Sequence, residues 1–441
     1  MTLQELTDRI EEKTAVLGVI GLGYVGLPVA AIFAEAGYQV IGVDLKADRV
    51  ETINAGRSPI EGNEPGLPEL LEKVVTSGRL TAATDYGTLA NADVVLIAVE
   101  TPVGEDHIPR FEALTSALRS LGQVLKEGAL VIVESTIAPG TMDRLVLPLL
   151  EESTGRIVNE GFFLGHCPER VMPGKLLHNL RNVSRVCGGM TPETSQVMVS
   201  LYEKVVQADL DPADCVTAEL VKTAENAYRD VNIAFANELA LICEAVGGDV
   251  WQVRELVNKS PGRNVLLPGA GVGGHCIPKD PWLLASGAGG SDTPVCLIPS
   301  ARAVNDGMPR HVADMTVKAL EEAGKEIAGS KILVLGYAYL ENTDDDRNSP
   351  SATLVEILRK RGAEIVIHDP YVSLYRGDLI SLAEGCDAAV VMVKHREYER
   401  LDPQDLIQRL NSPVIVDCRE VFGFGKIQKP AVIYRLGVGR V

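Results

Sequence analysis

Short β-branched runs alternate with helical stretches along most of this 441-residue chain. In the first half we expect strands at Val16–Ile20, Gln39–Val43, Val94–Val99 and Leu130–Glu134. A comparable series returns late in the chain, at Lys331–Leu335, Ile365–His368, Ala388–Val393 and Val414–Val416. Such alternation is typical of a parallel sheet with helices on both faces. The sequence therefore predicts an α/β protein with two Rossmann-like, doubly wound domains joined by a long central helix, although we find no residue-level repeat between them.

The central helix is predicted from an uninterrupted stretch. Residues 213–246 contain neither Gly nor Pro, and apolar residues recur there at spacings of three and four. Such a helix can join two domains and pair with a second copy of itself, and one long core helix fits the pattern equally well. We therefore expect an extension (1–14), a first Rossmann domain (15–208), a central helical domain (209–312) and a second Rossmann-like domain (313–441).

Composition narrows the class of protein. A net charge of −18 argues against nucleic-acid binding, which needs a basic surface. The eight cysteines include no C-x-x-C pair, so the sequence predicts neither a zinc site nor a disulfide framework. Residues 1–13 are charged and polar, and the longest apolar runs are strand-length. We expect a soluble cytoplasmic protein that binds no membrane and no metal.

A glycine-rich turn follows the first predicted strand. Gly21, Gly23 and Gly26 form a G-x-G-x-x-G pattern that opens an Ala-rich helix. The glycines allow a tight turn and a close approach of a pyrophosphate to the helix N-terminus. Asp44 ends the next strand, where a carboxylate accepts hydrogen bonds from a ribose and disfavours the extra phosphate of NADP. The pattern predicts an NAD site; the alternative is a plain glycine turn with a solvated Asp.

Two further strand ends carry threonines. Thr101 and Thr136 each follow a predicted strand, at the sheet edge where ligands bind in such folds. Threonine also favours helix N-caps. Pattern alone weighs cofactor contact and helix capping equally for both residues.

The most specific segment surrounds Cys276. Glycines at 271, 273 and 274 leave the thiol unshielded and let the backbone approach a ligand. Lys279 and Asp280 follow within four residues, and a nearby cation favours the nucleophilic thiolate. The segment predicts a reactive cysteine; the alternative is a glycine-rich turn that happens to carry a thiol.

The long helix carries polar residues at helical spacing. Lys222 and Asn226 are four residues apart and share one face, and Glu219 and Asp230 extend the same line. An ammonium there can stabilise an oxyanion, and an amide can position a water. A solvated stripe is the usual explanation of such a pattern and stays open.

Taken together, these motifs resemble the UDP-glucose/GDP-mannose dehydrogenase family. The resemblance spans residues 15 to 435 and rests on segments in the family's order: Gly21–Pro28, Glu219–Asn226, Gly273–Asp280, and Thr343–Asp345 with Arg347 and Ser349–Pro350. Within the family, His275, Pro281–Trp282, and Cys167–Val171 with Pro173–Gly174 are similar to the N-acetylhexosamine branch rather than the UDP-glucose branch.

That branch oxidises C6 of a UDP-N-acetylhexosamine, most often UDP-N-acetylmannosamine, to the uronate with two NAD per substrate, for surface polysaccharide precursors. The resemblance implies that Cys276 forms a thiohemiacetal and then a thioester, and that Glu169 activates or positions the hydrolytic water. It implies that Lys222, Asn226 and Asp280 handle the alcohol proton and the oxyanion. The implied NAD contacts are Gly21, Gly23, Tyr24, Val25, Gly26, Asp44, Arg49, Thr101 and Thr136. The implied UDP-sugar contacts are Glu169, Arg170, Lys222, Asn226, Arg263, Gly273 and Arg347.

The resemblance also makes the last domain a UDP-sugar-binding domain, and the protein a homodimer or a higher homo-oligomer. Arg347 resembles a ligand-contacting arginine, although pattern alone favours an internal ion pair with neighbouring aspartates. Leu340 stands where the family has Lys, so we expect the substrate's charge to be met elsewhere, by Arg263 of a second copy. Residues 1–14 lie beyond the family core and are expected to form a solvated helix.

Two other functions remain open from the sequence. A two-electron hydroxyacid dehydrogenase would share the NAD domain and a helix with Lys and Asn, but it leaves Cys276 and the late domain unexplained. A sensor of NAD or nucleotide-sugar would not need the full set of Lys222, Asn226, Cys276 and Asp280. Oxidation of an aldehyde to an acid does need a nucleophile that forms a tetrahedral adduct.

Overall fold

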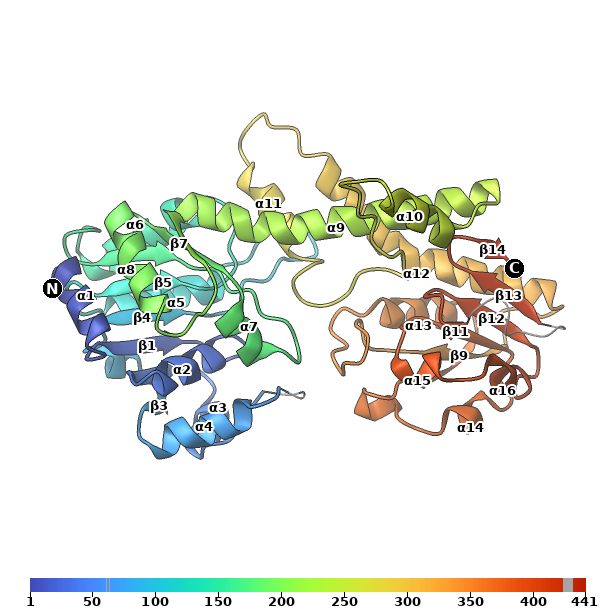
Figure 1. Cartoon of the computed structure of the whole chain (residues 1–441), viewed down its shortest axis with the longest axis horizontal. Helices are drawn as coiled ribbons and strands as arrows, with labels where there is room; N and C mark the ends of the chain where they lie inside the picture. Colours follow the sequence, from blue (N-terminus) through green and yellow to red (C-terminus); the bar gives the residue numbers. More distant parts are fainter. Residues whose placement is uncertain (61, 63, 423–430) are drawn as a thin grey trace. The chain divides into compact units, whose positions relative to one another are not determined.

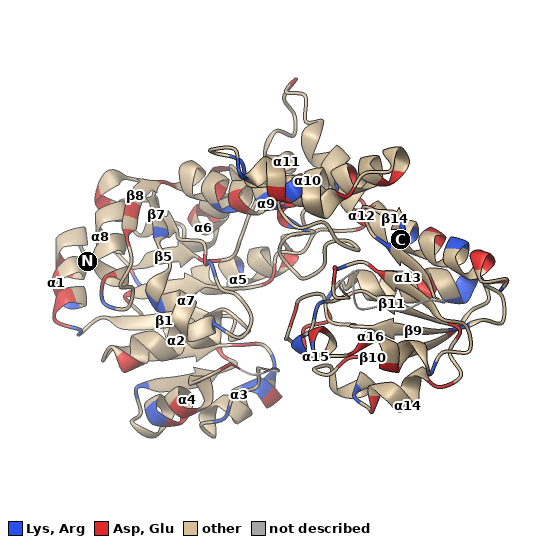
Figure 2. Cartoon of the chain, turned by 45° about the vertical axis from the view of Figure 1, so that its right-hand side comes forward, with Lys and Arg blue, Asp and Glu red and all other residues tan. Residues whose placement is uncertain are grey.

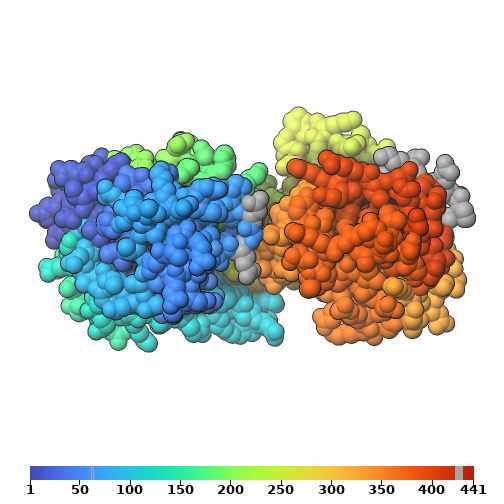
Figure 3. Space-filling view, turned by 90° about the horizontal axis from the view of Figure 1, so that it is seen from below, coloured from blue at the N-terminus to red at the C-terminus, as the bar shows by residue number. Residues whose placement is uncertain are grey.

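The structure, a computed structural model, describes residues 1–60, 62, 64–422 and 431–441 (Figure 1, Figure 3). It contains two compact units. The first comprises Met1–Glu225 and Trp282–Ser291, and the second comprises Asn226–Pro281 and Asp292–Val441. Helix α9 (Cys215–Val246) begins in the first unit and ends in the second, as one unbroken helix of 32 residues. The predicted long central helix is confirmed.

The first unit is built on an eight-stranded sheet of order β3-β2-β1-β4-β5-β6-β7-β8. All neighbouring strands pair in parallel except β6 and β7, which are antiparallel. The four predicted strands are confirmed as β1, β2, β4 and β5. The strands are β1 Val16–Ile20, β2 Gln39–Val43, β3 Leu80–Ala83, β4 Val94–Ile97, β5 Leu130–Val133, β6 Phe163–His166, β7 Arg185–Gly189 and β8 Leu210–Asp214.

Alternate residues of the central strands enter two separate apolar clusters, so helices cover both faces. Leu130 and Ile132 of β5 lie in one cluster, and Val131 and Val133 lie in the other. Each fully buried side chain of this kind contributes about 1.5–3 kcal/mol. One face packs against α1 Leu3–Glu11, α2 Gly26–Glu35, α4 Leu67–Thr76, α7 Leu176–Asn182 and α8 Pro192–Tyr202; the other packs against α5 Glu112–Gly122, the π-helical turn η2 Met142–Val146 and α6 Leu147–Thr154.

The second unit repeats this plan on a six-stranded sheet of order β10-β9-β11-β12-β13-β14, in which the last pair is antiparallel. The four late strands that we expected are confirmed as β9 to β12. The strands are β9 Lys331–Leu335, β10 Glu364–His368, β11 Ala388–Val391, β12 Val414–Asp417, β13 Val432–Arg435 and β14 Gly439–Arg440. One apolar cluster includes α12 Leu297–Glu322 and α13 Pro350–Lys360, and another includes α14 Leu379–Ala383, α15 Arg396–Glu399 and α16 Pro403–Ile407.

The expectation of a solvated helix for residues 1–14 is half wrong. Helix α1 forms and starts with a capping box between Thr2 and Glu5. Its Leu6 and Ile10, however, are completely buried and belong to the core of the first sheet. The sequence expectation was wrong because the short segment is mostly polar. The two core residues, four positions apart, are too few to form a clear apolar pattern.

The remaining helices are short or lie outside the sheet layers. They are α3 Ala47–Asn54, η1 Tyr86–Leu89, α10 Val250–Asn258, α11 Asp280–Gly287 and η3 Ser373–Tyr375. Within the described residues, we find no helix with both the length and the apolar character that a membrane crossing requires. Figure 2 shows acidic and basic residues interleaved along the surface helices, with no continuous basic stripe on the face in view.

Candidate functional site

The turn between β1 and α2 has the shape that the glycine pattern predicts. Gly21 has a φ of +86°, and a Cβ there would lie 2.5 Å from the carbonyl oxygen of Ala98. A Cβ at Gly26 would lie 1.9 Å from the carbonyl oxygen of Gly21. Both positions therefore exclude any larger residue. The first turn of α2 has no side-chain cap at Val25, so its N–H groups can serve a phosphate. Tyr24 instead uses its hydroxyl to donate to Glu64.

Asp44 lies just beyond β2, as the sequence indicated, and it is 8% exposed. Its Oδ2 accepts a hydrogen bond from the Leu22 N–H at 2.9 Å, and its Oδ1 accepts one from the Lys46 N–H at 3.0 Å. Arg49 forms an ion pair with it, with Nη1 3.0 Å from Oδ2. The structure thus brings Asp44 and Arg49 to the glycine turn, where a ribose would lie in a dinucleotide-binding fold.

Thr101 and Thr136 are neighbours. The Thr101 hydroxyl donates to the Thr136 carbonyl oxygen at 2.6 Å, joining the segments that follow β4 and β5. Neither residue caps a helix: α5 begins after Phe111, and η2 begins after Thr141. The capping alternative was wrong for both threonines, and their contact with a cofactor stays a prediction.

Glu169 lies in a buried charge cluster of the first unit. Arg185 has its Nη2 3.9 Å from Glu169 Oε1 and its Nη1 3.4 Å from Glu134 Oε1. Tyr202 donates to Glu134 at 2.5 Å, and its ring lies 5.0 Å from the guanidinium carbon of Arg185. Burial raises the pKa of both carboxyl groups, while Arg185 and, for Glu169, Lys222 oppose the shift. Burial therefore favours proton uptake by Glu169, and one guanidinium shared between two carboxyl groups offsets this only in part.

Sequence reasoning missed Arg185. The residue lies in β7, a strand whose sequence contains two glycines and shows no clear apolar alternation. Glu134 had been noted only as the end of a strand. No local pattern links residues 134, 169 and 185, because three different strand ends bring them together.

The polar line on α9 is not a solvated stripe. Glu219 is 0% exposed, and its carboxylate accepts from the backbone N–H groups of Gly140 and Met142 at 2.5 and 2.8 Å. Asp230 is equally buried and forms a 2.7 Å ion pair with Arg302. Lys222 is 8% exposed. The solvated-stripe alternative was wrong because both flanking acids hold neighbouring segments of the chain in place.

Cys276 is solvent-exposed in the second unit, unlike six of the chain's eight cysteines. Its carbonyl oxygen accepts from the N–H groups of Lys279 and Asp280 at 3.1 and 2.8 Å, which closes a turn behind the thiol. Its Sγ lies 3.9 Å from His275 Nδ1. Burial, followed by the charges of Lys279 and Arg347, lowers the pKa of His275, so its ring is neutral at pH 7.

Asn226 and Asp280 are brought together, as the resemblance implied. Asn226 Nδ2 donates to Asp280 Oδ2 at 2.5 Å, and Lys279 Nζ lies 3.0 Å from Asp280 Oδ1. Asp280 is fully buried. Asn226 therefore orients a carboxylate that lies four residues after the thiol in the chain.

The two glycines before the cysteine are required by their surroundings. A Cβ at Gly273 would lie 2.5 Å from Tyr339 Cβ, and Gly274 has a φ of +85° with the Tyr339 ring 2.8 Å from its ideal Cβ. The Gly274 N–H donates to the Arg347 carbonyl oxygen at 2.8 Å, and Asn348 Nδ2 donates to the Gly274 carbonyl oxygen at 3.1 Å. The segment 337–349 thus holds the cysteine loop.

The predicted substrate arginines have protein partners in this structure. Arg347 forms a two-pronged ion pair with Asp345 at 2.9 and 2.6 Å, which is the internal pair that pattern alone favoured. Arg170 pairs in the same way with Glu225 at 2.9 and 2.8 Å. Arg263 is exposed and donates to the Pro261 carbonyl oxygen at 3.2 Å. Substrate contact by these residues remains a prediction.

Arg419 was missed by sequence reasoning. It follows β12 at the carboxyl edge of the second sheet, and its guanidinium lies against Gly269, 2.5 Å from an ideal Cβ there. Among the described residues it forms no ion pair, and its Nε donates a hydrogen bond to the Met392 carbonyl oxygen at 3.1 Å. Burial lowers its pKa. A half-buried cation with which no described carboxylate forms an ion pair is suited to an anionic ligand.

Comparison with known proteins assigns both units to domains of one family. Residues 15–206, 216–307 and 333–423 match, in turn, the NAD binding, central and UDP binding domains of the UDP-glucose/GDP-mannose dehydrogenase family. A UDP-N-acetyl-D-mannosamine dehydrogenase of Pyrococcus horikoshii is 39% identical over 96% of this chain and 99% of that protein.

Solved structures show the same relationship. The structure of a UDP-N-acetyl-D-mannosamine dehydrogenase from P. horikoshii has a TM-score of 0.89 at 37% identity, over 97% of this chain and 100% of that one. An NDP-N-acetyl-D-galactosaminuronic acid dehydrogenase from Methanosarcina mazei has a TM-score of 0.88 at 38% identity, over 100% and 98% of the two chains. The protein therefore belongs to the UDP-glucose/GDP-mannose dehydrogenase family and is an NAD-dependent nucleotide-sugar dehydrogenase.

Proposed function

We propose that this protein oxidises C6 of UDP-N-acetylmannosamine to the uronate with two NAD per substrate, in the cytoplasm, for surface polysaccharide precursors. The exposed thiol of Cys276, four residues before the buried Asp280 to which Asn226 donates, is the observation that carries this proposal. An enzyme that stopped at the aldehyde would have no use for such a thiol. The name of the P. horikoshii relative supports an N-acetylmannosamine substrate.

In the first oxidation the C6 alcohol loses a proton and a hydride. NAD, held by the Gly21 turn and Asp44, would supply the hydride acceptor here and in the second oxidation. Lys222 and Asn226 lie one helical turn apart on α9, so their side chains project from the same side. We assign to Lys222 the stabilisation of the alkoxide that develops at C6. Asp280, held by Asn226, receives the proton.

In the second oxidation the Cys276 thiolate adds to the aldehyde carbon, which forms a C–S bond and a tetrahedral alkoxide. As the C=O bond re-forms, C6 releases its hydride and becomes a thioester. Water then attacks this carbonyl carbon, the C–S bond breaks, and the uronate and the thiolate are released. Glu169 accepts a proton from the attacking water, and Arg185 stabilises the carboxylate form that this role requires.

We propose that Arg419 helps to replace the family Lys that is absent at Leu340. Its guanidinium is half-buried at the sheet edge where ligands bind in open α/β folds, and no described carboxylate forms an ion pair with it. A diphosphate would supply the missing negative charge. Arg263 of a second copy would add a further cation.

A homodimer is part of the proposal. Along α9, Tyr228, Phe235, Ile242 and Val246 are 71%, 55%, 53% and 76% exposed. Their spacings of seven, seven and four place them in one row, and a row of exposed apolar side chains marks an interaction surface. We expect Phe235→Asp to shift the protein from dimer to monomer in light scattering. Arg229→Glu, at an exposed position about a third of a turn around the same helix, should leave the dimer intact.

The decisive experiment counts NADH formed per substrate consumed, across a panel of UDP-hexoses and UDP-N-acetylhexosamines. We expect two NADH, with the manno sugar preferred over its gluco and galacto epimers. One NADH with accumulating aldehyde or ketone would favour a two-electron dehydrogenase. Tight UDP-sugar binding without any NADH would favour a sensor.

A further inference from the structure

The two sheets contain a matching turn that the sequence did not reveal. After β1, Gly21 has a φ of +86° and donates to the Val43 carbonyl oxygen at 2.8 Å. After β9, Gly336 has a φ of +92° and donates to the His368 carbonyl oxygen at 2.9 Å. The next N–H in each turn donates to a carboxylate at the end of the adjacent strand, which is Asp44 in the first sheet and Asp369 in the second.

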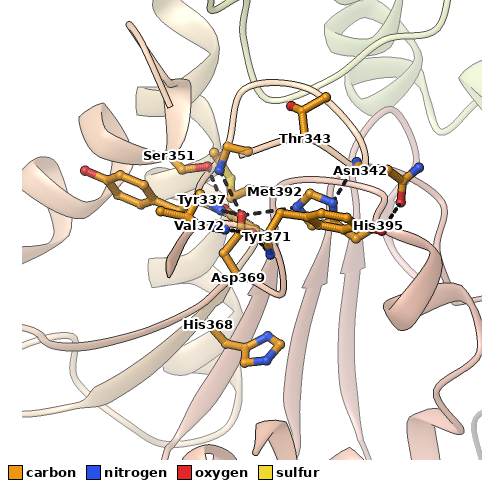
Figure 4. A network of polar contacts seen from close by, with 12 residues as sticks. Tyr337, Asn342, Thr343, Ser351, His368, Asp369, Tyr371, Val372, Met392 and His395 are labelled. Atoms are coloured by element: carbon orange, nitrogen blue, oxygen red, sulfur yellow. Dashed lines mark hydrogen bonds and ion pairs between the residues drawn. The ribbon is translucent and has the colours of Figure 1, made fainter. Parts of the chain in front are cut away.

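The two carboxylates differ in what surrounds them. Asp369 is 0% exposed, and its two oxygens accept from the N–H groups of Tyr337, Ala338, Tyr371 and Val372 at 2.7 to 3.0 Å. His395, also 0% exposed, places its Nε2 3.1 Å from Asp369 Oδ2 (Figure 4). Burial alone would raise the pKa of Asp369, but the hydrogen bonds from His395 and the backbone hold it well below its usual value. Asp369 has no lone pair left for a ribose.

His395 connects this carboxylate to a loop. The Asn342 N–H donates to His395 Nδ1 at 2.9 Å, so Nδ1 carries no proton and Nε2 is the donor to Asp369. Asn342 has a φ of +58°, and its Oδ1 accepts from the Arg396 N–H at 3.0 Å. Figure 4 shows Asp369, His395 and Asn342 in one continuous line of contacts.

The far end of the same loop holds the cysteine segment. The Tyr339 N–H donates to the Asp345 carbonyl oxygen at 3.0 Å and so ties the two arms of the loop together. Arg347 and Asn348 then bond both backbone groups of Gly274, two residues before Cys276. Tyr339 covers the α-carbon of Gly274. The line from Asp369 to Cys276 therefore runs through hydrogen bonds and the loop backbone between them, all within the second unit.

We infer that His395 is a positioning residue, which joins Asp369 to Asn342 and thereby holds the 337–349 loop where it places the Cys276 thiol. This inference rests on the proposed nucleophilic role of Cys276. In this second Rossmann-like unit, the His395 imidazole donates to the carboxylate that would otherwise bind a ribose. The turn thus stabilises the loop beside the nucleophile instead of a dinucleotide.

Two substitutions separate the two bonds of His395. In His395→Asn, the side-chain oxygen lies at the level of Nδ1 and can accept from the Asn342 N–H, but it cannot reach Asp369. In His395→Gln, the amide nitrogen lies at the level of Nε2 and can donate to Asp369, but Asn342 loses its acceptor. His395→Leu removes both bonds.

The readouts are the rate of Cys276 alkylation by iodoacetamide and the kcat and KM values. A Cys296→Ser background removes the other exposed thiol. We expect His395→Asn to stay near the parent in both readouts. We expect His395→Gln and His395→Leu to change the alkylation rate and to lower kcat by about 10- to 100-fold, since a misplacement of about 1 Å can have that effect, with the KM for NAD unchanged.

His368→Leu is the matched control. His368 is a second buried histidine at this edge, and it bonds Tyr398 and Gly377 rather than the loop. We expect it to lower the thermal midpoint without altering alkylation. The inference is overturned if His395→Leu alkylates and turns over like the parent, or if His395→Asn is as impaired as His395→Leu. If His395→Leu fails to fold, the Asn and Gln variants decide. A fully active Cys276→Ser variant would reject the proposed chemistry, whatever the alkylation pattern shows.

Discussion

The turns after β1 and β9 share a left-handed glycine and an acid at the end of the next strand, yet the two acids have different neighbours. Asp44 accepts from two backbone N–H groups and from Arg49, and part of its side chain remains exposed. Asp369 accepts from four backbone N–H groups and from His395, and none of it is exposed. The comparison teaches that the same turn can either bind a ligand or hold a neighbouring loop in place. Which of the two it does depends on how many lone pairs of the carboxylate already accept hydrogen bonds from the protein.

The chemistry divides along the same line. The first unit carries the dinucleotide turn and the buried Glu169 cluster, while the second carries the thiol and the Asn226–Asp280 pair. Each unit can therefore be disabled separately, and the defects should differ in kind.

The largest effect should come from the second unit. Cys276→Ser should lower the overall conversion by about 10³-fold or more, because no thioester can form. Binding of NAD and of the UDP-sugar, measured by calorimetry, should stay close to the parent. Cys296→Ser, at the other exposed thiol, is the control and should remain active. Full turnover of Cys276→Ser would exclude the covalent step.

Glu169→Gln, in the first unit, should slow thioester hydrolysis by about 10²–10⁴-fold, the usual contribution of a general base. A sugar adduct should then accumulate on Cys276 and appear as added mass on the intact protein. Hydrolysis needs the carboxylate form of Glu169, and burial raises the pKa of this residue. The hydrolysis rate of the parent protein should therefore rise with pH and level off only at a pH above the usual pKa range of carboxyl groups. Normal turnover without an adduct would remove Glu169 from the mechanism.

A matched pair tests ligand assignment. Asp44→Ala should raise the KM for NAD by about 10- to 100-fold, the effect of losing charged hydrogen bonds worth about 1.5–3 kcal/mol, and should weaken discrimination against NADP. Arg419→Met should instead raise the KM for the UDP-sugar and leave that for NAD unchanged. If both variants raised the KM for the same substrate, the assignment of NAD to the first unit and of the UDP-sugar to the second would be wrong.

The smallest effect is a difference in pH response. Burial raises the pKa of Glu219 to about 7, so its proton is held more tightly in the folded state, and local stability should fall as pH rises from about 4 to about 7. Asp369 has a lowered pKa despite its burial, so its contribution is present above about pH 4 and is lost on further acidification. Hydrogen exchange of residues 136–146 and 337–345, corrected for intrinsic rates, should show these opposite trends. Glu219→Gln should remove the pH dependence of exchange in residues 136–146.

Much of the fold was predictable from local pattern. Strands β1, β2 and β9 have the bounds that alternation indicated, because buried parallel strands are continuous β-branched runs. Strands β7 and β8 were not predicted. One contains Arg185 and two glycines, and the other is partly exposed, so neither forms an apolar run.

The site was predictable where one short segment carries the chemistry. Cys276 with its glycines, and the Gly21 turn with Asp44, were found from spacing. Arg185, Arg419 and His395 were not found, because each is identified by neighbours distant in the chain. The same limit explains why a solvated stripe stayed open for Glu219 and Asp230.

By itself the sequence determined the two strand-and-helix series, the glycine positions and the cysteine motif, because these depend on contacts within one turn or one strand. The tertiary structure alone decided which buried acids face a cation, which face backbone N–H groups and which remain accessible. The physical reason is that a carboxylate's charge, and its capacity to bind a ligand, depend on the donors that the folded chain brings around it from distant segments.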